Sequence, residues 1–205
     1  MQVLHGFLLQ KPACSRESTL EFGWAIGIPE VIKETHIHAR HTLETEKITS
    51  EVKGEEREEE RARQMIYHRP TRTGEYGVIS VFQPWRIGLN DSTMEYVVKD
   101  NERKERYKYA LRAYEALFTR TEGAMTSTRL AHTESFNGVI VYTETNFPVP
   151  VISPLKDTYI EEITKISESL KKQKINVVME KFDTISQFIE KLQKLENKDP
   201  WKRNG

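Results

Sequence analysis

Hydrophobic and polar positions follow different periods along the chain, and the change of period separates predicted helices from predicted strands. Between residues 101 and 120, large apolar side chains recur at spacings of three and four, the period of an amphipathic helix: Tyr107, Ala110, Leu111, Tyr114, Leu117 and Phe118. Asp100 suits the N-cap of this helix and Gly123 suits a stop signal beyond its end. The segment therefore predicts one long helix.

The same reasoning predicts the other elements. A second helix follows Asp157, with Ile160, Ile163, Ile166 and Leu170 on one face, and a third covers residues 182–195 with Asp183 as its cap. Strands are predicted at 19–28, 35–44, 78–82, 136–143 and 174–179, and the terminal WKRNG is expected to fray. This order favours an α+β fold with helices on one face of a largely antiparallel sheet.

One strand has an unusually polar face and leads into a charged segment. Alternation places His36, His38 and Arg40 on one side of the strand, and Ile37, Ala39 and His41 on the other. Residues 51–63 are almost wholly charged and offer no apolar face to bury. We expect a hairpin with a disordered tip.

Composition limits the possible partners. Lys+Arg and Asp+Glu each number 31 among 205 residues, so no overall field draws the chain to nucleic acid or to a membrane, and any phosphate contact needs a local patch. Cys14 is the lone cysteine, and no apolar run reaches the roughly 18 residues of a membrane span. No signal-peptide pattern opens the sequence, so we expect a cytoplasmic protein of one main domain, 1–205, without membrane association.

Local basic residues are the strongest candidates for chemistry. Arginines lie in or beside predicted strands and loops: Arg16, Arg40, Arg69, Arg72 and Arg129. Guanidinium groups make bidentate contacts with phosphate, and together these residues suggest a nucleic-acid groove, although each one alone is at least as consistent with a surface salt bridge. After the long helix comes a hydroxyl-rich loop that could hold a phosphate or merely cap a helix: Gly123, Thr126, Ser127, Thr128 and Arg129.

Metal and catalytic sites are less well supported. His36 and His38 could share a zinc ion, but His41 points to the opposite face of a regular strand, and no cysteine or acidic residue stands at ligand spacing. Cys14 has no recognisable activating neighbour, and the glutamates of 55–60 are typical of a solvated charge run. We therefore expect no metal, no cofactor and no catalytic residue.

Several segments, in their order along the chain, carry a family resemblance. They read VLHGFLLQ, SRESTLEFGWAI, RQMIYHRPTRTGEYGVISVFQPWRIG, NERKERYKYALRAYEALFTRTEGAMTSTR and NFPVPVISPLKDTYIEEI, and the closing strand and helix continue the match. The chain resembles the archaeal CRISPR-associated DevR (Csa-type) RAMP proteins, the backbone subunits of type I (I-A) Cascade. Since those relatives begin with a first sheet strand and an inserted helical lobe, the resemblance implies that the amino-terminal part is lacking.

The resemblance implies a fold, a function and partners. The fold would be RRM-like (ferredoxin-like), with residues 35–75 forming a protruding hairpin thumb. The function would be non-catalytic binding of CRISPR RNA, mainly through its phosphate backbone, within an antiviral effector complex. The implied partners are CRISPR RNA, other Cascade subunits, further copies of the same chain and target DNA.

The resemblance also assigns roles to residues. The loop from Gly123 to Arg129 matches the family's glycine-containing loop, which contacts the guide backbone. Gln64 and Met65 resemble the thumb residues that wedge near a displaced nucleotide. Arg40 matches a basic position on the strand entering the thumb, and Arg16 resembles a basic residue of the lobe that faces the guide.

Two alternatives stay open. RAMP relatives include guide-processing endoribonucleases, and His36, His38 or His68 could act as acid or base beside a Tyr or Lys. The second alternative is a truncated protein that has lost RNA binding and only docks to partners through an exposed sheet edge.

Overall fold

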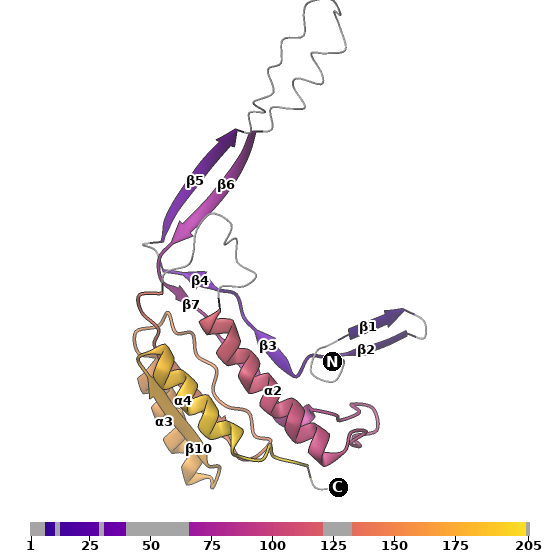
Figure 1. Cartoon of the computed structure of the whole chain (residues 1–205). Coiled ribbons are helices and arrows are strands. Elements are labelled where there is room, and N and C mark those ends of the chain that lie inside the picture. The colour runs from indigo at the N-terminus through magenta and orange to yellow at the C-terminus, as the bar shows by residue number, and fades with distance from the viewer. Residues whose placement is uncertain (1–6, 11–12, 29–30, 40–65, 121–132, 204–205) are drawn as a thin grey trace, which may run out of the picture. The chain divides into compact units, whose positions relative to one another are not determined.

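The computed structural model describes residues 7–10, 13–28, 31–39, 66–120 and 133–203. Contacts divide the chain into two compact units, Met1–Ala25 with Val78–Gly205, and Ile26–Gly77. Both units contain antiparallel strand pairs, and the described helices belong to the first unit (Figure 1). The predicted α+β class is confirmed.

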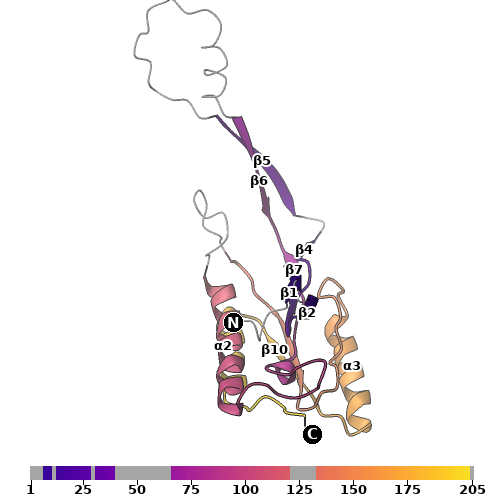
Figure 2. The same ribbon diagram turned by 90° about the vertical axis from the view of Figure 1, so that its right-hand side faces the viewer.

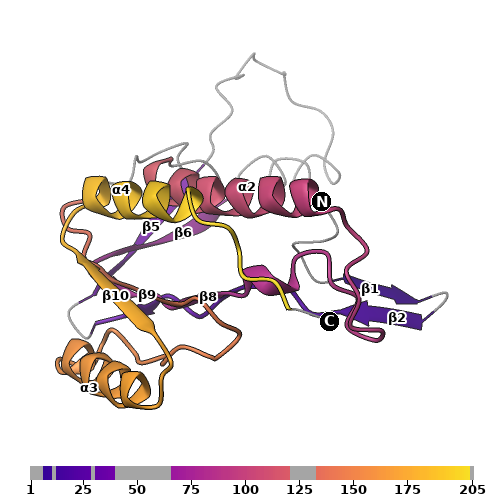
Figure 3. The same ribbon diagram turned by 90° about the horizontal axis from the view of Figure 1, so that it is seen from below.

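The helical part of the first unit has three layers. β9 (Gly138–Thr143) pairs antiparallel with β10 (Val177–Phe182). α2 (Asp100–Thr119) and α4 (Ile185–Glu196) cover one face of this pair, and α3 (Tyr159–Lys172) covers the other (Figures 2 and 3). The expectation that the helices share one face is therefore wrong.

Residue alternation along β10 explains this arrangement. Phe182 packs on Phe188 of α4, with ring centroids 5.0 Å apart, and Glu180 accepts a 3.3 Å hydrogen bond from Lys191 of the same helix. The intervening residues face α3, where Thr164 Oγ1 lies 3.8 Å from Met179 Sδ. Val177 and Phe182 are 1% and 7% exposed, and a strand that is apolar on both faces requires cover on both.

An aromatic core joins α2 and α4 to the strands. Phe136 lies between Phe118 of α2, at 5.0 Å, and Phe188 of α4, at 5.3 Å between ring centroids. Tyr107 is buried within the same core and its hydroxyl donates to Leu195 O at 3.0 Å. Burial raises the pKa of Tyr107 to about 12, because the phenolate would lose its hydration.

Two more strand pairs belong to the first unit. β1 (Phe7–Gln10) pairs with β2 (Ala13–Arg16), and β3 (Leu20–Phe22) pairs with β8 (Ser80–Phe82). The 3-10 helix η1 (Pro84–Arg86) follows β8 directly, since proline cannot continue the ladder but is suited to a helical first turn. The predicted end of the strand at Pro84 is thus confirmed.

The carboxy-terminal residues form a clamp with α2, which we define as Arg103 with Asp199–Arg203. Arg103 is 3% exposed and donates to the carbonyls of Pro200 and Trp201, at 3.1 Å each. Lys202 donates to both carboxylate oxygens of Asp100 at 2.9 Å, and this hydrogen bond lowers the pKa of Asp100. The prediction that the carboxy terminus frays is wrong for Trp201–Arg203, because the buried Arg103 guanidinium donates hydrogen bonds to the backbone carbonyls of Pro200 and Trp201.

The second unit is made of strand pairs alone. β4 (Ile26–Gly27) pairs with β7 (Tyr76–Gly77), and β5 (Ile32–Ala39) pairs with β6 (Ile66–Thr73) over eight residues each. Gly74 directly follows the last residue of β6 and has φ +156°. A Cβ at this position would stand 2.9 Å from Val31 Cα, so the close approach favours glycine. None of the described side chains of this unit is fully buried.

Helix boundaries differ from the predictions in physically clear ways. Asp100 is the first residue of α2 and Lys99 its N-cap, with no side-chain capping bond. The cap of α4 is Thr184, whose hydroxyl accepts from Gln187 N at 3.2 Å, and not Asp183. On α3, Ile163 is 3% exposed and Ile160 and Leu170 are partly buried, as predicted, but Ile166 is 39% exposed and Ser167 is buried beside that face instead.

Candidate functional site

Most of the predicted site residues lie outside the described residues. This holds for Arg40, Gln64 and Met65 of the predicted thumb, and for Gly123, Thr126, Ser127, Thr128 and Arg129 of the predicted loop. Arg69 lies in β6, where its backbone is described. Arg16, at the end of β2, is the predicted residue whose side chain can be followed in detail.

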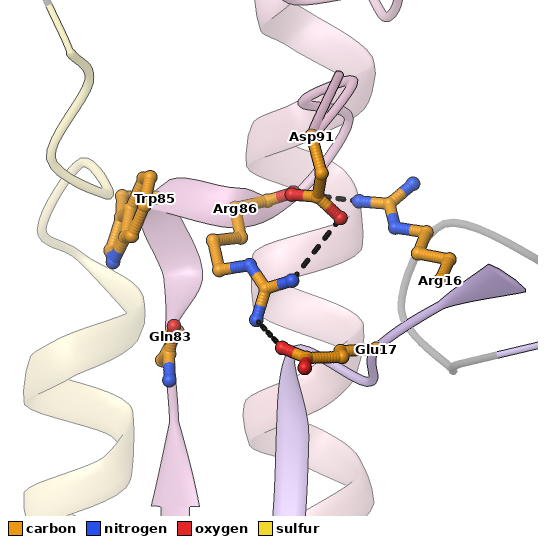
Figure 4. Close-up of a pocket in the computed structure, with 6 residues that line it drawn as sticks. All are labelled: Arg16, Glu17, Gln83, Trp85, Arg86 and Asp91. Atoms are coloured by element: carbon orange, nitrogen blue, oxygen red, sulfur yellow. Dashed lines mark hydrogen bonds and ion pairs between the residues drawn. The ribbon is translucent and has the colours of Figure 1, made fainter. Parts of the chain in front are cut away.

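Arg16 lines an open cavity of the first unit. The cavity has a volume of about 570 Å³ and is lined by Arg16, Glu17, Gln83, Trp85, Arg86 and Asp91 (Figure 4). Gln83 is positioned by continuation of the β3–β8 ladder, because its N–H donates to Thr19 O at 2.8 Å. The cavity thus forms where β2 ends and η1 begins.

Arg86 links the other charged residues of the cavity through hydrogen bonds. Its side chain is 10% exposed, and its guanidinium donates to Glu17 Oε2 at 3.5 Å and to Asp91 Oδ2 at 3.2 Å. Its carbonyl oxygen accepts from Arg16 Nη2 at 2.9 Å and from Leu89 N at 3.1 Å. Both the backbone carbonyl and the guanidinium of Arg86 are therefore already engaged in hydrogen bonds.

Arg16 has an N–H donor that no acceptor among the described residues uses. It is half-buried, and among the described residues its buried Nε has no hydrogen-bond partner. A guanidinium carries five N–H donors in a planar fork, and the structure uses one of its terminal nitrogens on the Arg86 carbonyl. Arg16 is thus the cavity residue with the clearest capacity to bind a further acceptor.

Trp85 is the aromatic residue of the cavity lining. Trp85 is half-buried and meets Trp201 edge to face, with ring centroids 6.4 Å apart. Its carbonyl accepts a 2.9 Å hydrogen bond from Tyr96, whose ring also lies 5.1 Å from the Arg103 guanidinium. The carboxy-terminal clamp therefore supports the Trp85 side of the cavity.

Sequence reasoning found Arg16 but missed the residues around it. The signal for the others is the segment QPWR followed by Gly88 and Asp91, a proline-started turn directly after a strand. Gly88 has φ +75°, and a Cβ there would stand 2.7 Å from Val98 Cβ, so this tight turn requires glycine. The turn brings Arg86 and Asp91 together, which spacing alone does not reveal.

The ribbon of β5 and β6 carries the predicted histidines. Its register pairs His36 with Arg69, His38 with Tyr67, and Ile37 with His68. Positions opposite one another share a face, so His36 and Arg69 stand on one face and His68 stands on the other. The backbone register therefore sets His38 opposite Tyr67, the kind of His–Tyr neighbour that the endoribonuclease alternative requires.

The described part of the chain contains neither a metal-binding cluster nor a membrane-spanning helix. No group of three His, Cys, Asp or Glu side chains there is placed to hold a metal ion; His41 lies outside it. Within the same residues, no helix combines the length and the apolar character needed to cross a membrane.

The fold and the site define an α+β protein with a cavity lined by arginine and tryptophan. Comparison with known proteins identifies its family. The model of the family described as "CRISPR-associated negative auto-regulator DevR/Csa2" matches residues 3–164. The chain belongs to this family, which confirms the resemblance found in the sequence.

One relative illustrates the extent of the match. A protein of Methanocaldococcus jannaschii named "CRISPR-associated protein Cas7/Cst2/DevR" is 26% identical over 171 residues. The aligned region covers 82% of this chain and 53% of that protein. The chain thus spans about half the length of the relative it matches.

Proposed function

We propose that this chain is a non-catalytic CRISPR RNA-binding backbone subunit of a type I Cascade-like antiviral effector complex. It contacts the guide mainly through the phosphate backbone and associates with copies of itself and with other subunits along the RNA, with target DNA as a further ligand. Membership of the DevR/Csa2 family supports the assignment to a CRISPR system.

The observation that carries the proposal is the cavity at Arg16. Arg16 has a buried Nε without a partner among the described residues, and Trp85 forms a neighbouring wall. Guanidinium donors and aromatic faces are the groups with which proteins bind single-stranded RNA.

An RRM-like fold with a thumb is part of this proposal. The succession of β9, α3, β10 and α4, with an antiparallel strand pair packed under helices, supports an RRM-like core. The long pairing of β5 with β6 supports a thumb built on residues 35–75. Arg69, in β6 of that ribbon, is one of the residues that would contact the RNA.

Variants of the arginines test the proposal. Binding of a labelled single-stranded guide RNA is measured by fluorescence anisotropy over a range of salt concentrations. Each lost phosphate contact lowers the slope of log affinity against log salt by about 0.7. We expect this change for Arg129→Gln, whereas Lys165→Gln on the exposed side of α3 should leave the slope unchanged. Equal slopes for both variants and the wild type would contradict the assignment of Arg129.

Self-association is tested with RNAs of increasing length. Sedimentation velocity of the full chain with guide RNA should give complexes that gain protein copies as the RNA is lengthened. A fixed stoichiometry at every length would contradict a backbone role. Gel analysis of the same RNA after long incubation also tests for cleavage; loss of cleavage in His36→Ala would favour the endoribonuclease alternative.

A further inference from the structure

The charges of the cavity cancel. Arg16 and Arg86 contribute two positive groups, and Glu17 and Asp91 contribute two negative groups. A phosphate in the cavity would be attracted by the guanidiniums and repelled by carboxylates that line the same space. The cavity is therefore poorly suited to an isolated anion, although it contains two arginines.

The groups left available are of mixed kind. Arg86 is tied to Glu17 and Asp91 and is 10% exposed, so it fixes these carboxylates in place and presents few donors of its own. Glu17 and Asp91 are 84% and 40% exposed, and can accept further hydrogen bonds from solvent or from a ligand. Arg16 supplies donors, and the amide of Gln83 supplies both a donor and an acceptor.

A flat group with donors and acceptors along its edge fits this set. Nucleobases have such edges, and carboxylates accept from their amino groups while arginines donate to their ring nitrogens and carbonyl oxygens. Trp85 offers an aromatic face on which a base can stack. The volume of about 570 Å³ falls within the range of about 300–1,000 Å³ typical of small-ligand pockets.

We propose that this cavity holds one unpaired nucleobase of the bound RNA, stacked on Trp85 and contacted at its edge by Arg16, Gln83 and the two carboxylates. The inference rests on the proposed RNA binding and adds a base subsite to contacts that are otherwise made with phosphates. Since the cavity is neutral, this contact contributes affinity that does not depend on salt, in contrast to the phosphate contacts.

The experiment combines a change in the RNA with a change in the protein. Affinities of the full chain are measured for a single-stranded RNA and for a fully abasic ribose-phosphate strand of the same length, with wild type, Trp85→Leu and Trp24→Leu. The fully abasic strand is used because a strand with one missing base could shift its register. Trp24 is 89% exposed and does not line the cavity, so its variant is the matched control.

We expect Trp85→Leu to bind the intact RNA about tenfold more weakly than wild type, as for the loss of one base–aromatic stack, with an unchanged salt slope. It should bind the abasic strand as wild type does, and Trp24→Leu should match wild type on both strands. Asp91→Asn, which leaves the ring in place, should likewise lower the ratio of intact to abasic affinity. Thermal unfolding confirms that each variant is folded.

Three results would overturn the inference, and they are distinguishable. If wild type binds both strands equally and with the same salt dependence, RNA binding stands and the base subsite is wrong. If Trp85→Leu weakens binding of both strands by the same factor, the residue supports the backbone contacts and not a base. Absence of binding to either strand at low salt would contradict the proposed function itself, and the subsite with it.

Discussion

The helical body of the first unit and the β5–β6 ribbon of the second unit use apolar residues in opposite ways. In the body, Ile87, Leu111 and Phe182 are 0%, 4% and 7% exposed. In the ribbon, Ile32 and Ile37 are 60% and 68% exposed, although the strands pair over eight residues each. Side-chain burial determines the structure of the body, whereas backbone pairing determines that of the ribbon.

This difference indicates where ligands can act. Isolated two-stranded ribbons are only marginally stable in water, and exposed apolar side chains are available to a partner or a nucleic acid. Within the body the same distinction holds for arginines: Arg103 is enclosed by the carboxy-terminal clamp, while Arg16 faces an open cavity. The two arginines therefore differ in the burial of their surroundings and not in residue type.

The largest expected effect contrasts truncations to alanine in the two regions. Phe188→Ala removes a side chain that is 7% exposed and packs on three aromatic rings, so we expect a loss of about 3–5 kcal/mol in unfolding free energy. Ile37→Ala should cost less than about 0.5 kcal/mol. Chemical denaturation followed by far-ultraviolet circular dichroism measures both. Comparable losses would contradict the contrast.

The next effect concerns the carboxy-terminal clamp. Arg103→Gln removes charged donors from the carbonyls of Pro200 and Trp201, and we expect a cost of about 2 kcal/mol. Release of Trp201 from Trp85 should also shift tryptophan emission to longer wavelength. Lys108→Gln changes an exposed charge of the same helix and should do neither. An unchanged emission spectrum in Arg103→Gln would show that the clamp does not depend on this residue.

A smaller effect appears at alkaline pH. Tyr107 has its pKa raised from 10.0 to about 12 by burial, so the unfolded state releases the phenolic proton before the folded state does. The contribution of this group is complete below pH 10 and is lost as the pH rises through about 12. We therefore expect the stability difference between wild type and Tyr107→Phe to fall over that interval. A difference that stays constant across it would exclude a buried, neutral Tyr107.

The smallest effect is at acidic pH. The hydrogen bond from Lys202 lowers the pKa of Asp100 below 3.8, so its stabilising contribution is present above 3.8 and is lost as the pH falls through the lower folded value. Both side chains are about half exposed, so solvent screens the pair and Asp100→Asn should lower the stability only slightly at neutral pH. Urea denaturation from pH 7 to pH 2 should show the two proteins converging. Divergence at low pH would contradict the sign.

Hydrophobic periodicity predicted the elements of the helical body well where a single buried face determines the secondary structure. The three- and four-residue spacing in α2 gave the helix because Tyr107 and Leu111 are buried. It placed Phe182 in a helix, whereas Phe182 ends β10, because an apolar residue at a strand–helix junction fits both periods. The clamp was missed since its contacts join residues about 97 positions apart.

The site was only partly predictable for the same reason. Arg16 was identified as a basic residue beside a strand, but Arg86 and Asp91 join it through contacts between distant segments. Arg16 and Arg86 are 70 positions apart and meet where β2 ends beside η1. Local sequence patterns therefore indicated the kind of chemistry, whereas tertiary packing determined which side chains share the cavity.

The most direct test of the central claim is titration of the full chain with a labelled single-stranded CRISPR guide RNA at two salt concentrations, beside a duplex DNA of equal length. We expect binding to the RNA that weakens with salt and exceeds binding to the duplex. No binding at the lower salt concentration, or equal affinity for RNA and duplex DNA, would contradict the claim that this chain is an RNA-binding subunit.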